Sequence, residues 1–238
     1  RVDLAGLAGG AFPALSVVVL WPPTPGSGAG GSGGARSAGA GSGGAGGSGG
    51  PGAGMGLAWG LPDGSFAHRR GLITKAEVRA VALGKLALPA AGVLWDVGAG
   101  SGSVSVECDR LAPGLDVYAV DRPPAGSRGG GDDLEANTAG TGVRVVWGSA
   151  PEVLATLPDP DRVFVGGGGL DVLDAVLGRL RPGGVVVATY AAMDRAAAAA
   201  SRLGQVVQVS VSRGVPVGPD GALRLAALNP VFVCWGPG

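Results

Sequence analysis

Three alternating glycines in the stretch Gly98–Gly102 follow an apolar run that carries an acid, Asp96, near its end. The run 93–97 is β-prone and residues 103–111 are compatible with a helix, so the spacing predicts a strand, a tight loop and a helix. Glycine lets the backbone turn sharply and lets a ligand approach where a Cβ would collide. The start of a helix offers free N–H groups and the positive end of its dipole. The stretch therefore predicts a loop that cradles a cofactor, either a dinucleotide or S-adenosylmethionine.

Two details of this loop favour S-adenosylmethionine. Ser103 stands where the dinucleotide fingerprint G-x-G-x-x-G needs its third glycine. The carboxylate of Asp96 would repel a pyrophosphate, whereas it can fix the loop or accept a hydrogen bond from an amino-acid-like ammonium. A second apolar run ends in Asp121, 23 residues beyond Gly98, which is close to the spacing at which a carboxylate meets ribose hydroxyls. The loop and Asp121 together predict a site for S-adenosylmethionine.

The composition limits the classes of function that the chain can have. Its 238 residues carry 18 basic and 18 acidic side chains, and this formal net charge of zero argues against nucleic-acid binding. The two cysteines, Cys108 and Cys234, have no metal-binding or redox spacing and are predicted to be buried thiols. The apolar run 15–21 is far too short to cross a membrane and lacks the order of a signal peptide. We therefore expect a soluble, cytoplasmic protein without a bound metal.

The chain divides into three parts by composition. Residues 1–22 hold one strand-like run, which cannot fold alone. Residues 23–58 are predicted to be a flexible linker, because 16 of the 29 residues from Gly26 to Gly54 are glycine and nothing there offsets the entropy of ordering. Residues 59–238 have the apolar periodicity of strands and helices and are predicted to be one folded domain.

Strands and helices alternate along this predicted domain, which implies parallel βαβ units. Thr74 and Ser149 each begin a capping box of the form S/T-x-x-E, which predicts helix starts at both. Two closing strands joined by a Gly/Pro-rich turn predict an antiparallel hairpin at one edge. The fold class is α/β, a class I S-adenosylmethionine-dependent methyltransferase with a Rossmann-like doubly wound sheet of order 3-2-1-4-5-7-6. The expected strands are 93–97, 116–121, 143–148, 163–165, 185–190, 206–212 and 227–235; the expected helices are 74–86, 103–111, 132–137, 170–180 and 193–203.

Four stretches together resemble the decarboxylating precorrin-6Y C5,15-methyltransferases of cobalamin (vitamin B12) biosynthesis. They are GLITKAEVR at 71–79, LWDVGAGSGS at 94–103, VFVGG at 163–167 and LNPVF at 228–232. The resemblance covers about residues 59–235 and is to the C-terminal domain of the proteins in that family. Residues 1–22 look like the end of its upstream domain, a tetrapyrrole methylase. The resemblance implies methylation of carbon 15 of a late precorrin (precorrin-6B type), with loss of carbon dioxide from the ring C acetate.

The resemblance also implies the residues of the cofactor site, to which the loop itself adds Asp96. The predicted contacts are Thr74, Asp96, Gly98, Ala99, Gly100, Ser101, Gly102, Asp121, Ser149 and Ala150. The chain departs from the family at two places. Ser149 stands where an acid usually meets the adenine amino group, and the Pro/Gly-rich stretch 123–131 replaces a regular helix.

No catalytic side chain is predicted, because the sulfonium is already activated and the precorrin carbon is an electron-rich, enamine-like nucleophile. Positioning in a dry pocket can supply most of the acceleration. A substrate with many carboxylates needs cations, for which the candidates are Arg69, Arg70, Lys75, Arg195, Arg213 and Arg224. The implied partners are the tetrapyrrole substrate, an upstream carbon-5 methylase domain and a further copy of the chain. The alternatives are another small-molecule or nucleic-acid methyltransferase on the same fold, a nicotinamide-dependent oxidoreductase and a non-catalytic tetrapyrrole- or partner-binding domain.

Overall fold

The computed structural model describes residues 58–69, 71–123, 133–218 and 221–237. Several of the predictions fall on the rest of the chain. The methylase remnant at 1–22, nearly all of the linker at 23–58 and almost the whole irregular stretch 123–131 lie outside the described residues, as does Arg70.

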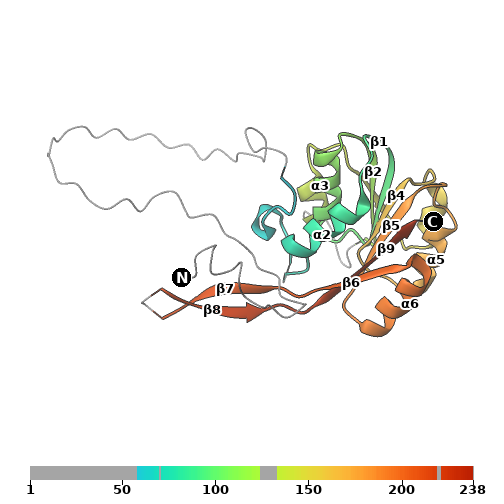
Figure 1. Cartoon of the computed structure of the whole chain (residues 1–238). Coiled ribbons are helices and arrows are strands. Elements are labelled where there is room, and N and C mark those ends of the chain that lie inside the picture. Colours follow the sequence, from blue (N-terminus) through green and yellow to red (C-terminus); the bar gives the residue numbers. More distant parts are fainter. Residues whose placement is uncertain (1–57, 70, 124–132, 219–220, 238) are drawn as a thin grey trace, which may run out of the picture. The chain divides into compact units, whose positions relative to one another are not determined.

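A seven-stranded mixed sheet forms the centre of the described domain (Figure 1). Its strands lie in the order β3-β2-β1-β4-β5-β9-β6, in which β9 is antiparallel to both neighbours and the other adjacent pairs are parallel. The order predicted for a class I methyltransferase is therefore confirmed, with β9 as the seventh strand of the fold. The strands are β1 Ala91–Val97, β2 Gly114–Asp121, β3 Arg144–Trp147, β4 Arg162–Val165, β5 Val185–Tyr190, β6 Gln205–Val209 and β9 Val231–Pro237.

Helices cover both faces of the sheet, because successive side chains of a strand point to opposite faces. In β1, Leu94 packs in a core with α2 and α3, whereas Trp95 packs in a second core with α5, α6 and η2. Both side chains are fully buried. The described helices are η1 Asp63–Ser65, α2 Ala76–Leu86, α3 Ser103–Leu111, α4 Asp133–Thr138, η2 Glu152–Thr156, α5 Leu170–Leu177 and α6 Met193–Leu203.

The prediction of a plain turn between the last two strands of the sheet is wrong. Two further strands, β7 (Ser212–Val217) and β8 (Ala222–Ala227), follow β6 and form a separate two-stranded antiparallel sheet. This ribbon, which we call the arm, extends away from the seven-stranded sheet in Figure 1. Leu223 and Leu225 on β8 are 71% and 74% exposed.

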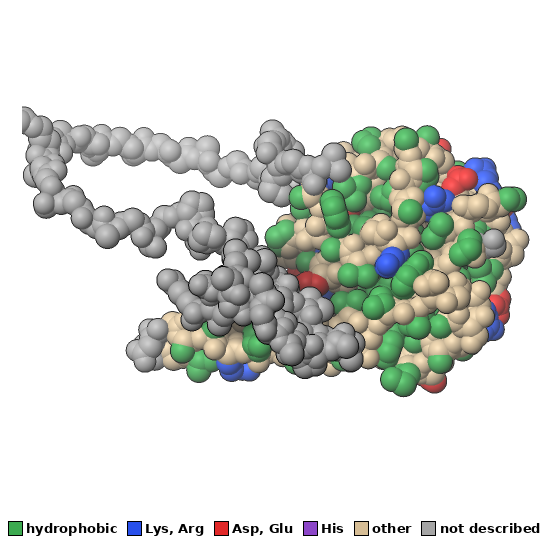
Figure 2. Space-filling model, viewed as in Figure 1, with side chains coloured by type: hydrophobic (Ala, Val, Ile, Leu, Met, Phe, Trp, Pro, Cys, Tyr) green, Lys and Arg blue, Asp and Glu red, His purple; other side chains and the backbone are tan. Residues whose placement is uncertain are grey.

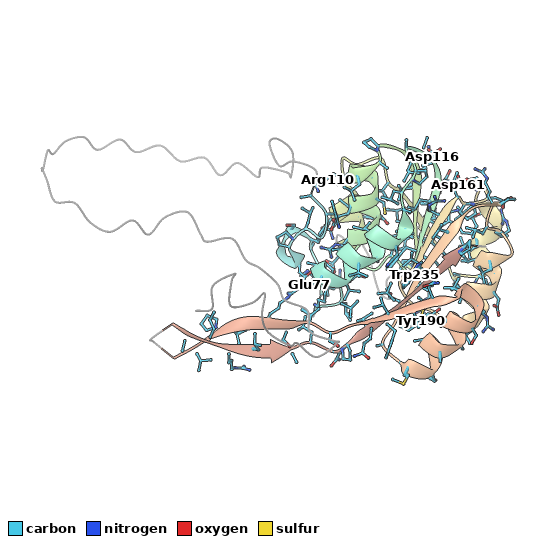
Figure 3. The ribbon with its side chains drawn as sticks, in the orientation of Figure 1. Glu77, Arg110, Asp116, Asp161, Tyr190 and Trp235 are labelled. Atoms are coloured by element: carbon cyan, nitrogen blue, oxygen red, sulfur yellow. The ribbon has the colours of Figure 1, made fainter. Side chains whose placement is uncertain are left out.

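An ion-pair cluster holds the base of the arm against α2. Arg213 of β7 donates two hydrogen bonds to the Glu77 carboxylate, at 3.0 and 2.7 Å, and pairs with Asp63 at 2.9 Å. Figure 3 shows Glu77 on the side of α2 that faces the arm. The hydrogen bonds from Arg213 lower the pKa of the Glu77 carboxyl. Arg213 therefore has a structural role between the arm and the sheet domain.

The start of α2 differs from the predicted capping box. Lys75 is the N-cap residue, without a side-chain capping bond, and α2 begins at Ala76. The backbone N–H of Ala76 donates instead to Asp63 Oδ1 at 2.9 Å. The helix is thus capped by an acid from an earlier segment, and Thr74 does not have the capping role that its sequence context predicts.

A fully buried ion pair, Arg79–Glu107, fixes the chain that precedes α2. Arg79 Nε donates to Glu107 Oε1, and its terminal nitrogens donate to the carbonyls of Thr74 and Leu61. Glu107 also accepts the backbone N–H groups of Gly60, at 2.6 Å, and Leu61, at 3.0 Å. One pair thereby links α2 and α3 to the segment 60–61. The buried Glu107 carboxylate is compensated by the Arg79 guanidinium and by two backbone N–H groups.

Both cysteines lie in the cores with free thiols, as predicted, and burial raises the pKa of the Cys108 thiol. Within the described ranges, none of the helices has the length and apolar character needed to cross a membrane. On the face shown in Figure 2, the blue basic and red acidic side chains are interspersed with apolar and neutral ones.

Candidate functional site

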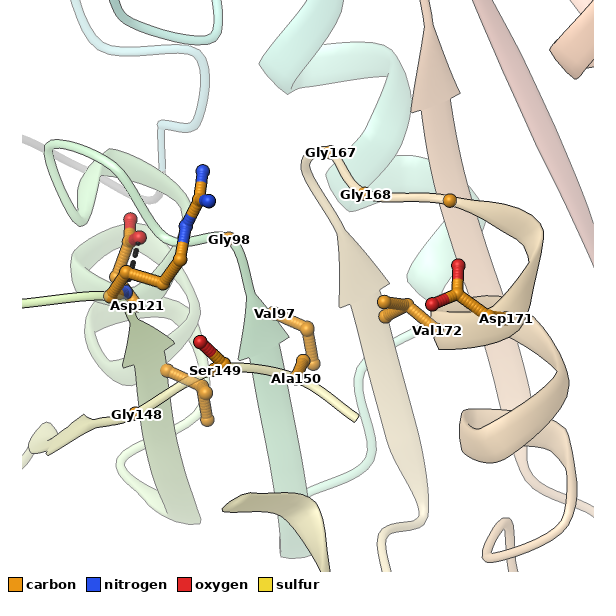
Figure 4. Close-up of a pocket in the computed structure, with 13 residues that line it drawn as sticks. Val97, Gly98, Asp121, Gly148, Ser149, Ala150, Gly167, Gly168, Asp171 and Val172 are labelled. Atoms are coloured by element: carbon orange, nitrogen blue, oxygen red, sulfur yellow. Dashed lines mark hydrogen bonds between the residues drawn. The ribbon is translucent and has the colours of Figure 1, made fainter. Parts of the chain in front are cut away.

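A cavity of about 430 Å³ lies at the carboxyl ends of β1, β2 and β4 (Figure 4). Ligands of doubly wound sheets bind at this edge, outside the carboxyl ends of the parallel strands. The lining combines the predicted glycine loop and Asp121 with the loops that follow β3 and β4. The lining residues are Val97, Gly98, Val120, Asp121, Arg122, Gly148, Ser149, Ala150, Gly167, Gly168, Gly169, Asp171 and Val172.

The loops after β1 and β4 meet through their backbones. A Cβ added to Gly166 would lie 2.8 Å from the carbonyl oxygen of Gly98, closer than real Cβ contacts. Gly98 also has a φ of +77°, which a side chain disfavours. The two loops therefore touch through backbone atoms alone, and both Gly98 and Gly166 are needed for the loops to come this close.

Asp121 holds the glycine loop from the neighbouring strand. Its Oδ2 accepts the backbone N–H of Gly100 at 2.6 Å, and its Oδ1 accepts the N–H of Arg122 at 2.6 Å. Gly100 has a φ of +58°, and a Cβ there would meet nothing within 4 Å. The carboxylate is half-buried at the cavity wall, where it keeps lone pairs for further donors.

Asp96 lies inside the protein, behind the loop. Its Oδ2 accepts hydrogen bonds from the backbone N–H of Ser105, at 3.0 Å, and from the Ser105 hydroxyl, at 2.5 Å. Its Oδ1 is buried and has no hydrogen-bond partner among the described residues. Burial raises the pKa of Asp96 to about 7, against the opposing effect of the Ser105 bonds. Of the two roles that the sequence allowed, this geometry favours the structural one, in which Asp96 fixes the first turn of α3 directly after the loop.

The remaining predicted cofactor residues divide into two groups. Ser149 and Ala150 line the cavity, but the helix predicted from the capping box at Ser149 is the short 3₁₀ helix η2, whose N-cap position is Pro151 without a side-chain capping bond. The second group belongs to the loop and helix starts and does not line the cavity; it consists of Thr74, Ala99, Gly100, Ser101 and Gly102. The Ser101 hydroxyl is buried without a hydrogen-bond partner among the described residues.

The predicted substrate-binding cations that the structure describes are not among the residues that line the cavity. Arg69 is 3.7 Å from the carboxylate of Asp133, and Lys75 donates to the carbonyl of Gly71 at 3.0 Å. Arg195 on α6 and Arg224 on β8 are exposed. These cations do not form one cluster in the described structure, and Arg213 is engaged at the base of the arm.

Sequence reasoning missed the half of the cavity that follows β4. Gly167, Gly168 and Gly169 could have been found, because a glycine run directly after a predicted strand resembles the glycine loop after β1. Asp171 gave no comparable signal, because an acid in the first turn of a helix is common for electrostatic reasons alone.

Residues 65–234 match the family model described as "Precorrin methyltransferase domain". The chain belongs to the precorrin methyltransferase family. Its sheet is that of a class I methyltransferase.

Two curated relatives illustrate how the family is organised. A probable cobalt-precorrin-6B C(15)-methyltransferase (decarboxylating) of Pyrobaculum calidifontis is 42% identical over 185 residues, which cover 73% of this chain and 93% of the relative. A decarboxylating precorrin-6Y C(5,15)-methyltransferase of Sinorhizobium sp is 37% identical over 169 residues, which cover 68% of this chain and 40% of that longer protein. This precorrin methyltransferase domain thus corresponds to nearly all of one relative and to less than half of the other.

A solved structure agrees with the fold of this precorrin methyltransferase domain. The crystal structure of precorrin-6y C5,15-methyltransferase from Geobacter metallireducens superimposes with a TM-score of 0.66 at 36% identity. The superposition covers 78% of this chain and 100% of that chain.

Proposed function

We propose that this precorrin methyltransferase domain uses S-adenosylmethionine to methylate carbon 15 of a late precorrin of the precorrin-6B type, with decarboxylation of the ring C acetate. The names of the two curated relatives support the reaction. The cavity at the carboxyl edge of the sheet supports the cofactor, because Gly98, Asp121 and the Ser149–Ala150 pair all line it. That juxtaposition of three separate segments is the observation that carries the proposal.

The residues of the cavity fit an adenosyl ligand. Its volume of about 430 Å³ is within the ordinary range for small-molecule sites. The Asp121 carboxylate can accept ribose hydroxyls, and the open space beside Gly100 leaves room for a ligand to approach the loop. When bound, S-adenosylmethionine supplies a methyl group on a sulfonium that is already activated.

The chain's own contribution is positioning. The close approach of Gly166 to Gly98 brings the loops after β1 and β4 together, and Gly98 and Gly167 line the cavity without side chains, so that a ligand can lie against backbone. Asp121 fixes the loop and the ribose side through one carboxylate. Ser149 and Ala150 line the cavity after β3, where we place the adenine side. Orienting the donor toward the substrate carbon and excluding water are the means of acceleration.

The test begins with binding. Isothermal titration of the chain with S-adenosylhomocysteine and, separately, with NAD should give saturable binding of the former alone. A decarboxylated, once-methylated tetrapyrrole should then form from a precorrin-6B-type substrate and S-adenosylmethionine, detected by mass spectrometry. Binding of NAD in place of the adenosyl ligand would favour an oxidoreductase. Ligand binding without product would favour the non-catalytic tetrapyrrole-binding alternative.

For the acetate and propionate groups of the substrate, we keep Arg69, Arg70, Lys75 and Arg195 as the proposed partners. We also infer that a carbon-5 methylase is the functional partner of this domain, supported by the longer relative, whose name covers both carbons.

We further infer that the arm joins copies of the chain. Leu223 and Leu225 lie on one face of the ribbon, opposite the face that carries Arg213 and Arg224. Arg213 turns that second face toward α2, so the leucine face points away from the domain. An isolated two-stranded ribbon is marginally stable in water, and a second arm packed on the leucines would bury them.

A further inference from the structure

The cavity contains a second carboxylate that the proposed cofactor contacts do not use. Asp171 is the second residue of α5 and lines the cavity together with Asp121. Figure 4 shows the two acids on opposite sides of the site, Asp121 beside the glycine loop and Asp171 beyond the loop that follows β4. A ligand that fills the cavity therefore lies between two carboxylates from different walls.

The loop after β4 holds Asp171 in this place. The Asp171 carboxylate folds back over Gly169: a Cβ there would collide with Asp171 Oδ1, so a side chain at 169 would turn the carboxylate out of this position. A Cβ on Gly168, whose φ is +102°, would likewise press on Val172 at 3.2 Å. The glycine run thus serves to bring the first turn of α5 close over the cavity.

Asp171 has no salt-bridge partner in the described structure, unlike two acids elsewhere in the same half of the domain. Asp174, later in the same helix, pairs with Arg202 at 2.6 Å, and Asp161 pairs with Arg181 at 3.0 Å. Within the part of the chain that the structure describes, no arginine or lysine forms a salt bridge with Asp171. Its charge is therefore available to a ligand in the cavity.

The charged residues that line the cavity are Asp121, Asp171 and Arg122, two negative and one positive, which leaves one negative charge. The methyl donor carries a positive sulfonium, whereas its product carries a neutral thioether. Asp171 is exposed in this structure. A ligand that fills the cavity displaces water between the charges, so their attraction becomes stronger than in bulk water. An unpaired carboxylate across from the ribose side will hold the donor more tightly than the product.

We propose that Asp171 is a specificity-determining residue that makes the site prefer S-adenosylmethionine over S-adenosylhomocysteine. The inference rests on the proposed function, because it concerns the same cavity. Its consequence is that the product leaves more easily once the methyl group has been transferred, so that the site exchanges product for a fresh donor.

The experiment measures the dissociation constants of both ligands by isothermal titration, without tetrapyrrole, in three proteins. They are the unaltered chain, Asp171→Asn and the matched control Asp194→Asn. Asp194 is also the second residue of a helix, α6, and is exposed, but it does not line the cavity. Asp171→Asn should weaken S-adenosylmethionine binding by about threefold to thirtyfold, as expected for one partly screened charge. Binding of S-adenosylhomocysteine should change by less than about twofold, since no charge is lost opposite a neutral sulfur.

Asp171→Glu keeps the charge and should keep the preference for the donor. Asp194→Asn should leave both constants unchanged, and thermal melts check that each variant is folded. An unchanged ratio of the two constants in Asp171→Asn would overturn the inference and leave the proposed function standing. Asp171 would then act only on the loop or on the ammonium group that both ligands share. If the unaltered chain binds neither ligand, that result contradicts the proposed function itself, and the inference about Asp171 falls with it.

Discussion

The Asp121 carboxylate accepts the backbone N–H of Gly100 across 2.6 Å, and so joins the end of β2 to the loop that follows β1. One side chain thereby shapes the loop and faces the cavity. A ligand that hydrogen-bonds Asp121 meets a loop already arranged, so less ordering is needed on binding.

We predict that Asp121→Asn weakens binding of S-adenosylhomocysteine by about tenfold to a hundredfold. Hydrogen bonds to a charged partner contribute about 1.5–3 kcal/mol, and the neutral amide makes weaker bonds to both the loop and the ligand. Isothermal titration gives the affinity, and thermal melts of the ligand-free variant serve as control. Affinity equal to that of the unaltered chain would remove Asp121 from the site.

The glycine loop provides a matched pair of alanine substitutions. Gly100 and Gly102 both have positive φ, +58° and +73°, so alanine at either should cost about 1–2 kcal/mol of backbone strain. At Gly102 the new Cβ would also lie 2.6 Å from Leu134 Cδ1 and 3.3 Å from Thr138 Cγ2. We therefore expect Gly102→Ala to destabilise the protein by about 1–3 kcal/mol more than Gly100→Ala, measured by urea unfolding. Equal decreases in the free energy of unfolding in the two variants would show that α4 shifts to make room for the added methyl group.

Asp96 should make the stability depend on pH in an unusual direction for an acid. Its pKa is about 7 in the folded protein and near 3.8 when exposed, so the folded state binds the extra proton between these values. The contribution of Asp96 to the free energy of unfolding is therefore fully present below about pH 4 and is lost as the pH rises through about 7. The total change is a few kcal/mol.

The measurement compares Asp96→Asn with the unaltered chain by urea unfolding at about pH 5 and about pH 8. The asparagine cannot titrate, and subtracting the two proteins cancels the other groups. The stability of the unaltered chain relative to the variant should fall between the two pH values. If the difference in free energy of unfolding between the two proteins is the same at both pH values, Asp96 is ionised in the folded state throughout.

The buried pair Arg79–Glu107 should be one of the most sensitive points of the fold. Arg79→Met leaves the Glu107 carboxylate buried without its cation, which should cost about 3–5 kcal/mol. Arg202→Met is the control, because it breaks a salt bridge of similar length on the surface and should change the stability little. Urea midpoints of the two variants give the comparison; similar small losses would show that water reaches Glu107 when Arg79 is absent.

The arm gives a prediction about assembly. Replacing Leu223 and Leu225 with glutamate should lower the molecular mass measured by light scattering, because charges would then face charges between paired arms. Arg224→Glu alters the residue between them, on the opposite face of the ribbon, and should leave the mass unchanged. A monomeric unaltered chain would contradict the inference directly.

The sheet could be predicted from the sequence because its signals are local and repeated. Short β-prone runs such as 93–97 and 163–165 end in glycine loops, and each is followed by residues with helical spacing. The alternation restricts the topology to few choices. The glycine loop and Asp121 were found for the same reason, since strand ends at one edge of a parallel sheet meet in space.

The missed features depend on contacts between distant residues. The capping box at Thr74 yields to Asp63, whose side chain reaches Ala76 from 13 residues away, and no spacing rule shows this. The arm was read as a turn because Gly214 and Pro216 are typical of turns, while its pairing partners lie on β8. Asp171 was missed because only the folded loop after β4 turns it to the cavity.

The position of β9 between β5 and β6 has a consequence for synthesis on the ribosome. Among the described strands of the sheet, β9 is the last along the chain, yet it is the one that pairs with β6, and it also covers one edge of β5. Until residues 231–237 emerge, the nascent chain carries an open sheet edge at Val186 and Val187, the kind of edge that pairs with other chains. The sheet therefore closes only when β9 has been made, and until then the growing chain needs protection from its neighbours.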